Sequence, residues 1–158
     1  MEYILEDLLG TEDFRRYENM WKYTWFARKF ILENLPFWEM EPRDDLLMNE
    51  AARIGEESAQ VIAKEGEIYA IYLPIADISL DFNLTGEVGE FVLRWYNPRS
   101  GKFEGSSSVV IAGKMINLGQ PPNGITEDWV VLLTRKTTTR QSLMMMYCSH
   151  GCRVPIPE

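Results

Sequence analysis

Residues 86–104, GEVGEFVLRWYNPRSGKFE, most strongly constrain what this chain can fold into. Phe91, Leu93 and Trp95 alternate with Val, Arg and Tyr, and a period of two is typical of a β-strand with two different faces. The NPRSG segment that follows has turn chemistry, because proline presets its own φ, asparagine tolerates turn geometry and glycine can adopt a positive φ. The sequence therefore predicts a β-hairpin whose return strand begins with KFE.

Further short apolar segments, separated by glycine- and proline-rich turns, continue the β pattern along the chain. The segments that we expect to form strands besides the hairpin are 61–63, 68–73, 78–82, 108–112, 115–118 and 129–134. Seven or so short strands joined by such turns are typical of an antiparallel β-sandwich. We therefore predict a mainly β fold, an antiparallel β-sandwich with an N-terminal helical segment.

The N-terminal part of the chain predicts a helix that is apolar on two sides. Thr11 can cap this helix, which should run to about Leu35, because Pro36 disfavours helical geometry in the residue before it. One stripe contains Phe14, Tyr17, Trp21, Trp25, Leu32 and Leu35, and the opposite side contains Tyr23, Phe26, Ala27 and Phe30. Such a helix is normally buried on more than one side. It is expected either to lie in a pocket of its own domain or to have packed against something that the chain lacks.

Charge and composition exclude several classes of function. The 158 residues carry a formal net charge of −8, which argues against a nucleic-acid or anionic-membrane partner, because phosphate binding requires clustered lysine and arginine. The first residues, MEYILEDLLGTED, have no basic region and no long apolar run. We therefore expect no signal peptide, no membrane-spanning segment and, for the chain as written, a cytoplasmic location.

A dense group of carboxylates follows the expected helix, at Glu39, Glu41, Asp44 and Asp45. Two carboxylates at the right separation could hydrolyse a glycoside, and with further oxygen ligands they could bind calcium. The alternative is that the glutamates point into solvent while Asp44 caps the next turn, and we favour this interpretation because charges are mostly solvated. We therefore predict neither a catalytic residue nor a metal site in this group.

The tail, residues 137–158, carries both cysteines of the chain, Cys148 and Cys152, and its one histidine, His150. Three such ligands fall short of the four of a structural zinc site, so a tail disulfide or free thiols are the favoured interpretation. A nucleophilic site would have to use this single tail histidine, which argues against one. No glycine loop has a phosphate-binding spacing, and we expect no cofactor. The tail is expected to be irregular, with at most one edge strand near 143–147.

Aromatic residues are candidates for stacking on the apolar faces of sugars. Trp95 and Trp129 belong to apolar strand patterns and are expected in the core, whereas Tyr96 shares the other face of its strand with Arg94. Tyr96 and the turn residue Arg99 are therefore expected to be exposed. The candidate ligand-binding residues are Tyr96, Arg99, Trp38 and Glu39.

Three segments, YAIYLP at 69–74, RWYNPRSG at 94–101 and DWVVLL at 128–133, together resemble a known family. The chain is similar there to the small β-sandwich called the putative collagen-binding domain of a collagenase. In bacterial proteins that domain follows a (β/α)8 barrel related to apiosidase-like glycoside hydrolases. The segment LPFWEMEP at 35–42 looks like the last barrel helix and its connector. The resemblance extends over roughly residues 21 to 134.

The resemblance implies three segments. Residues 1–50 resemble the end of the barrel, residues 51–136 form the β-sandwich domain, and residues 137–158 are the tail. A complete barrel takes about 200 residues or more, so no catalytic residue of the family can be carried over, and we expect no enzyme activity.

The function that the resemblance implies is that of a non-catalytic accessory module of a glycoside-hydrolase-like protein, which binds a polysaccharide or a matrix polymer. The alternative is an interaction fragment that docks on a separate barrel subunit, or self-associates, through Trp21, Phe26 and Phe30. The resembled family is often secreted.

Overall fold

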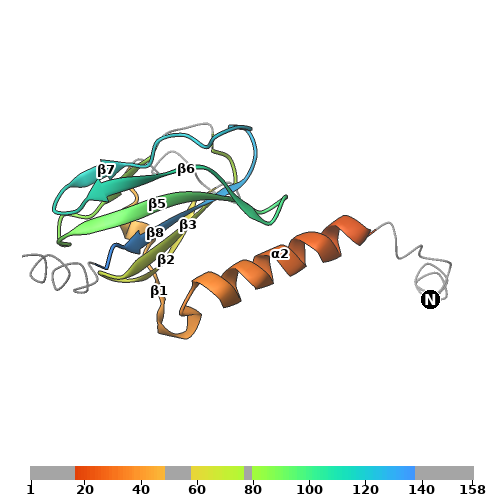
Figure 1. Ribbon diagram of the computed structural model, residues 1–158, viewed down its shortest axis with the longest axis horizontal. Helices are drawn as coiled ribbons and strands as arrows, with labels where there is room; N and C mark the ends of the chain where they lie inside the picture. Colours follow the sequence, from red (N-terminus) through yellow and green to blue (C-terminus); the bar gives the residue numbers. More distant parts are fainter. Residues whose placement is uncertain (1–16, 49–57, 77–79, 138–158) are drawn as a thin grey trace, which may run out of the picture.

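The computed structural model describes residues 17–48, 58–76 and 80–137. They form three layers: a helix, a six-stranded antiparallel sheet and a two-stranded antiparallel sheet (Figure 1). The elements are α2 (Glu18–Asn34), β1 (Glu41–Pro42), β2 (Gln60–Lys64), β3 (Ile68–Leu73), β4 (Asp81–Asn83), β5 (Glu90–Asn97), β6 (Lys102–Ile111), β7 (Met115–Asn117) and β8 (Trp129–Arg135), with short 3-10 turns at Phe37–Glu39 and Asp44–Leu46. The prediction of a mainly β, antiparallel fold with an N-terminal helix is confirmed.

The strand order of the large sheet is β1-β2-β3-β8-β5-β6, and β4 pairs with β7 in the small sheet. The predicted hairpin is present as β5 and β6, in which Asn97 pairs with Lys102. The return strand and the segment 108–112, which we expected to be separate, belong to one strand. The pairing register shifts between Leu93 and Trp95, and Gly105 has a φ of 74°. A bulge therefore interrupts the sequence pattern without ending β6.

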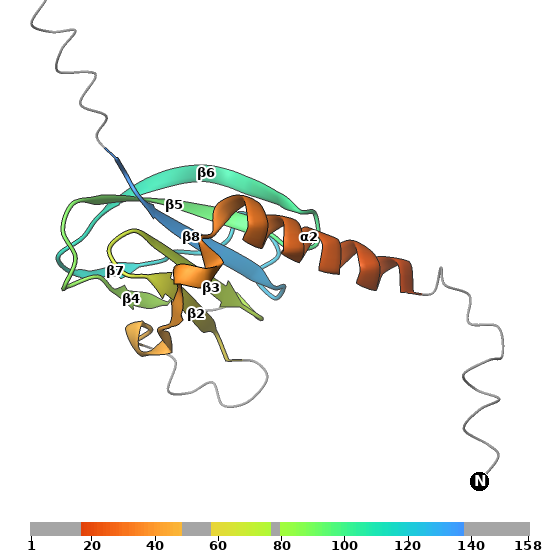
Figure 2. The same cartoon turned by 90° about the horizontal axis from the view of Figure 1, so that it is seen from below.

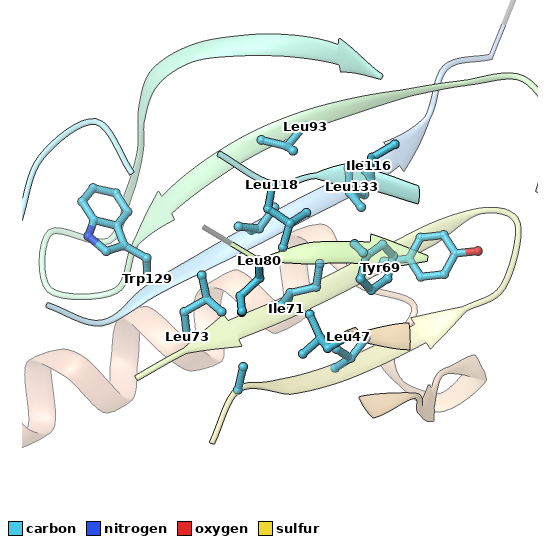
Figure 3. Packing of buried hydrophobic residues seen from close by; sticks show 14 of the residues in the cluster. Leu47, Tyr69, Ile71, Leu73, Leu80, Leu93, Ile116, Leu118, Trp129 and Leu133 are labelled. Atoms are coloured by element: carbon cyan, nitrogen blue, oxygen red, sulfur yellow. The ribbon is translucent and has the colours of Figure 1, made fainter. Parts of the chain in front are cut away.

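Alternation along the central strands creates two apolar cores. In β8, Val131 and Leu133 face the two-stranded sheet, whereas Val130 and Leu132 face the helix. The first core lies between the sheets and contains the side chains shown in Figure 3. There the rings of Trp95 and Trp129 meet edge to face, with centroids 6.1 Å apart. The prediction that both tryptophans belong to the core is confirmed.

The second core lies between α2 and the opposite face of the large sheet, as seen from below in Figure 2. Phe30 and Leu35 from the helical segment pack there on Tyr96 and Leu132. Leu35 leaves the helix with φ −122° and ψ 132°, so the expected end before Pro36 is confirmed. The helix is described from Glu18 onward, and Thr11 lies outside the described residues. No helix in the described ranges is long and apolar enough to cross a membrane.

Candidate functional site

The turn between β5 and β6 is held closed by its own polar side chains. The Oδ1 atom of Asn97 accepts hydrogen bonds from the backbone N–H groups of Arg99, at 3.0 Å, and of Ser100, at 3.3 Å. The carboxylate of Glu104 accepts from the hydroxyl of Ser100 at 2.7 Å and from the amide of Asn97 at 3.0 Å. Hydrogen bonds from Ser100, Asn123 and Asn97 lower the pKa of Glu104. The turn is therefore a rigid element that can position its neighbours.

The side chain of Arg99 interacts with other residues of the same domain, Asp128 and Trp129. Its Nη1 atom donates to the backbone carbonyl of Asp128 at 2.6 Å and to the Asp128 carboxylate. The guanidinium also lies over the ring of Trp129, 5.5 Å from the ring centroid. Arg99 is half-buried and ties the turn to the start of β8. Its assignment as a ligand-binding residue stays a prediction.

Tyr96 lies beneath α2. Its hydroxyl donates a hydrogen bond to the backbone carbonyl of Phe26 at 3.0 Å, and its ring centroid lies 4.4 Å from that of Phe30. Only 4% of Tyr96 is exposed, and burial raises the pKa of its hydroxyl. The expectation that Tyr96 is exposed is wrong, because α2 covers the face of the sheet to which Tyr96 belongs.

Gly101, in the same turn, lies directly against the Phe26 ring of α2. Gly101 has a φ of 70°, and a Cβ atom placed on it would lie 2.5 Å from Cδ1 of Phe26. This distance is shorter than real Cβ contacts allow, so only glycine lets the Phe26 ring come this close. The hairpin turn and Tyr96 thus form a seat for α2.

The other side of α2 is exposed. Trp21, Trp25 and Leu32 are 61%, 60% and 63% exposed, and their spacing places them on one side of the helix. We call these three residues the outer face of α2. Phe30 is buried against the chain's own sheet, so it is not available to a partner and its expected place in an interface is wrong. Among the described residues, the sheet and the hairpin turn cover α2 only on the side that carries Phe26 and Phe30, so they do not form the enclosing pocket that was one of the two alternatives.

The connector after α2 presents one more exposed aromatic residue. Trp38 is 80% exposed, and the neighbouring Glu39 has its Oε2 atom 2.9 Å from Nζ of Lys64. Lys64 also pairs with Glu67 at 2.6 Å, and hydrogen bonds to Glu67 and Glu39 raise its pKa. Lys64 therefore bridges the carboxylates of Glu39 and Glu67, and each of them has an ion-pair partner within the chain. The ligand-binding assignments of Trp38 and Glu39 stay predictions.

The two aspartates of the connector have separate structural partners. Oδ1 of Asp44 accepts a hydrogen bond from the backbone N–H of Val61 at 2.6 Å, so it links the connector to β2. Its expected role as a helix cap is wrong, since the Asp44–Leu46 turn has no side-chain cap. Asp45 accepts two hydrogen bonds of 2.8 Å from Arg43, which lowers the pKa of Asp45 and raises that of Arg43.

Metal ligands are not gathered in the described ranges, which hold no group of three or more His, Cys, Asp or Glu side chains suited to a metal ion. Cys148, His150 and Cys152 lie outside the described residues, so the expectation for the tail stays a prediction. A pocket that no sequence pattern indicated lies between α2 and the large sheet. It has a volume of about 230 Å³, and its mostly apolar lining includes Ala27, Ile31, Ile62, Tyr72 and Val130.

The family of the chain follows from the segment that contains β2 to β8. Residues 42–134 match the model of the family described as "Putative collagen-binding domain of a collagenase". The chain belongs to this family. The described geometry shows what the RWYNPRSG segment does in this family member: it places Trp95 in the core and Tyr96 and Gly101 beneath α2. No curated protein matches the chain in sequence.

Solved structures with a similar fold include glycoside hydrolases. One is described as "Glycoside hydrolase", with a TM-score of 0.58, 16% sequence identity, and coverage of 72% of this chain and 25% of that chain. Another is a glycoside hydrolase family 5 structure from Bacteroides vulgatus ATCC 8482, with a TM-score of 0.58 and 17% identity, covering 74% and 25%. The chain therefore spans about a quarter of the length of these glycoside hydrolases. The matched family is described as a binding domain, not a catalytic one.

Proposed function

We propose that this chain acts as a non-catalytic accessory module that docks on a glycoside-hydrolase (β/α)8 barrel through the outer face of α2. The observation that carries this proposal is the exposure of Trp21, Trp25 and Leu32 on a helix whose opposite side is firmly anchored. Trp21 and Trp25 are exposed aromatic side chains on an ordered element, with the exposed Arg28 on the same side of the helix between them and Leu32. Exposed tryptophans of this kind mark an interaction site, because leaving their rings in water costs free energy.

The kind of partner is argued from the fold comparison and from the outer face itself. The fold of this chain occurs as about a quarter of longer glycoside hydrolase chains, so a fold of this type can belong to a larger hydrolase. Tryptophan is the residue most enriched at the energetic centres of protein interfaces, and two tryptophans lie here one helical turn apart. Both features support a protein surface, and specifically a barrel, as the partner of α2.

The test is co-elution of the purified chain with glycoside-hydrolase barrels encoded in the same genome. The wild-type chain is expected to co-elute with one of them, and a Trp21→Ser/Trp25→Ser variant is expected to lose that complex. Val88→Ser is the matched control, since Val88 is an exposed apolar residue in the loop before β5. Co-elution that survives the double substitution, or the lack of a complex with every barrel, would contradict the proposal.

A second candidate function is binding of a polysaccharide or a matrix polymer through Trp38. The observation that favours it is the exposure of this tryptophan, at 80%, in a family whose description names collagen binding. Flat, exposed aromatic rings can stack on apolar faces of a polymer. Tyr96 is buried under α2, so it would contribute to such binding only by supporting the helix.

Co-sedimentation with insoluble polysaccharides and with collagen, at two salt concentrations, separates the two candidates. Binding to one polymer that resists salt, is lost in Trp38→Ala and is retained in Trp21→Ser/Trp25→Ser would support polymer binding through the connector. If no polymer retains the wild-type chain, the docking function is left as the better explanation.

A further inference from the structure

The free edge of β6 is a second surface suited to binding another chain, and it is separate from the outer face of α2. β6 is the last strand in the order of the large sheet, and within the described ranges it pairs only with β5. It is ten residues long, and the run from Gly105 to Gly113, GSSSVVIAG, contains neither a charge nor a proline. Such an edge is a ready template for another strand.

The opposite edge of the same sheet shows how an edge is normally blocked. The edge strand β1 has two residues, Glu41 and Pro42, so one of them is charged and the other lacks a backbone N–H. Charged residues of the connector and of β2 surround it, including Arg43 and Lys64. β6 has one such device, the bulge at Gly105, beside which the ring of Pro122 lies. Beyond the bulge, residues 108–111 carry no charge and no proline, so this part of the edge can still pair with another strand.

The direction of the peptide groups in β6 defines which residues can pair. The backbone N–H of Ala112 donates to the carbonyl of Gly89 at 2.9 Å, on the β5 side. Because peptide groups alternate in direction along an antiparallel strand, those of Val109 and Ile111 point away from β5. Their side chains are 53% and 61% exposed and, with Met115, line a hollow of about 330 Å³ at this edge.

We propose that β6 pairs antiparallel with the β6 strand of a second copy of this chain, about a two-fold axis at Val109. The outward N–H and C=O groups of Val109 then bond to those of the partner subunit's Val109, which joins the two large sheets into one. A two-fold axis is compatible with this pairing because the same residue supplies both donor and acceptor on each side.

A second copy fits this edge because the strand is complementary to itself. Self-pairing of an uncharged run places no like charges opposite one another, and it brings two β-branched valines together as a favourable cross-strand pair. The antiparallel direction also brings the Lys114 end of one strand toward the end of the other that begins at Glu104, instead of placing like ends together.

The test is sedimentation of the full chain, in reductant, over a range of concentrations. The wild-type chain is expected to pass from a monomer of 18.4 kDa to a dimer as the concentration rises. Val109→Lys and Val109→Glu are each expected to weaken dimerisation by about fivefold or more, since each places two like charges opposite one another at the axis. An equimolar mixture of the two variants should restore the dimer, because the introduced lysine then faces the introduced glutamate.

Controls make the result specific for the β6 edge. Val88→Lys introduces the same charge at another exposed valine and should leave dimerisation unchanged. Trp21→Ser/Trp25→Ser should also leave it unchanged, so the β6 proposal can fail or succeed independently of docking through α2. A wild-type chain that stays monomeric, or a dimer that survives Val109→Lys, would overturn the proposal. Slow hydrogen exchange of the Val109 and Ile111 amides in a purely monomeric sample would also overturn it, because another part of the same chain would then cover the edge.

Discussion

The ring of Phe26 occupies the space beside Gly101 in which any other residue would carry its Cβ atom, although 75 positions separate the two in sequence. One hydrogen bond from the hydroxyl of Tyr96 to the carbonyl of Phe26 fixes the helix at the same point. The position of α2 on the sheet is therefore determined by the hairpin turn as much as by the apolar core beneath the helix.

Replacement of Gly101 by alanine is expected to destabilise the fold by about 2–3 kcal/mol. About 1 kcal/mol comes from holding alanine at a φ of 70°, and the rest from displacing the Phe26 ring. The change should appear in the free energy of unfolding measured by urea denaturation.

Two glycines serve as controls for that measurement. Gly119→Ala keeps the positive φ, 75°, but meets no atom within 4 Å, so it should cost only about 1 kcal/mol. Gly86→Ala also meets no atom within 4 Å and should be close to neutral. If Gly101→Ala costs no more than Gly119→Ala, the contact with Phe26 does not contribute to stability.

Tyr96→Phe is expected to lower the free energy of unfolding by about 1 kcal/mol, because it removes the hydrogen bond from the Tyr96 hydroxyl to the Phe26 carbonyl. The phenyl ring retains its packing on Phe30. Tyr72→Phe, at a half-exposed tyrosine on β3, is the comparison and should have a smaller effect. Equal losses in the two variants would contradict the role assigned to the Tyr96 hydroxyl.

The two sides of α2 should respond differently to truncation. Phe30→Ala is expected to cost about 3 kcal/mol, because it opens a cavity in the second core. Trp25→Ala on the outer face should change stability by no more than about 0.5 kcal/mol. A large loss for Trp25→Ala in the monomer would mean that the outer face is already covered within the chain.

Alkaline pH is expected to destabilise the domain through Tyr69. Burial, together with a hydrogen bond to Glu87, raises the pKa of Tyr69 to about 12, whereas an unfolded tyrosine has a pKa of about 10. The folded state therefore binds the proton more tightly. The stabilisation is complete below pH 10 and is lost as pH rises toward 12. The slope of unfolding free energy against pH over this range should be shallower in Tyr69→Phe, and an unchanged slope would rule out Tyr69 as the cause.

Local patterns were sufficient to predict the hairpin and the burial of Trp95 and Trp129, because strand alternation records which face of a sheet is apolar. They did not predict the burial of Tyr96. Arg94 on the same face of the strand suggested an exposed face, but α2 covers it, and the contact residue Phe26 lies 70 positions earlier in the chain. Asp44 failed for a similar reason, since its partner is the backbone of Val61 rather than its own turn. Both sides of α2 are apolar in sequence, so helical periodicity could not predict which side packs on the sheet and which is exposed. That depends on tertiary contacts.

α2 is fixed to the sheet at its C-terminal end, while its N-terminal half, which carries both tryptophans of the outer face, projects from the domain. Its contacts with the sheet lie around Phe26, Phe30 and Leu35, whereas the N-terminal turns extend away from the sheets (Figure 1). From Phe30 to Trp21 the arm is about 14 Å long at 1.5 Å per residue. A partner bound to the tryptophans would exert a force on α2 that is transmitted to the hairpin turn. The rigidity of that turn therefore determines how far the orientation of the sandwich relative to its partner can vary.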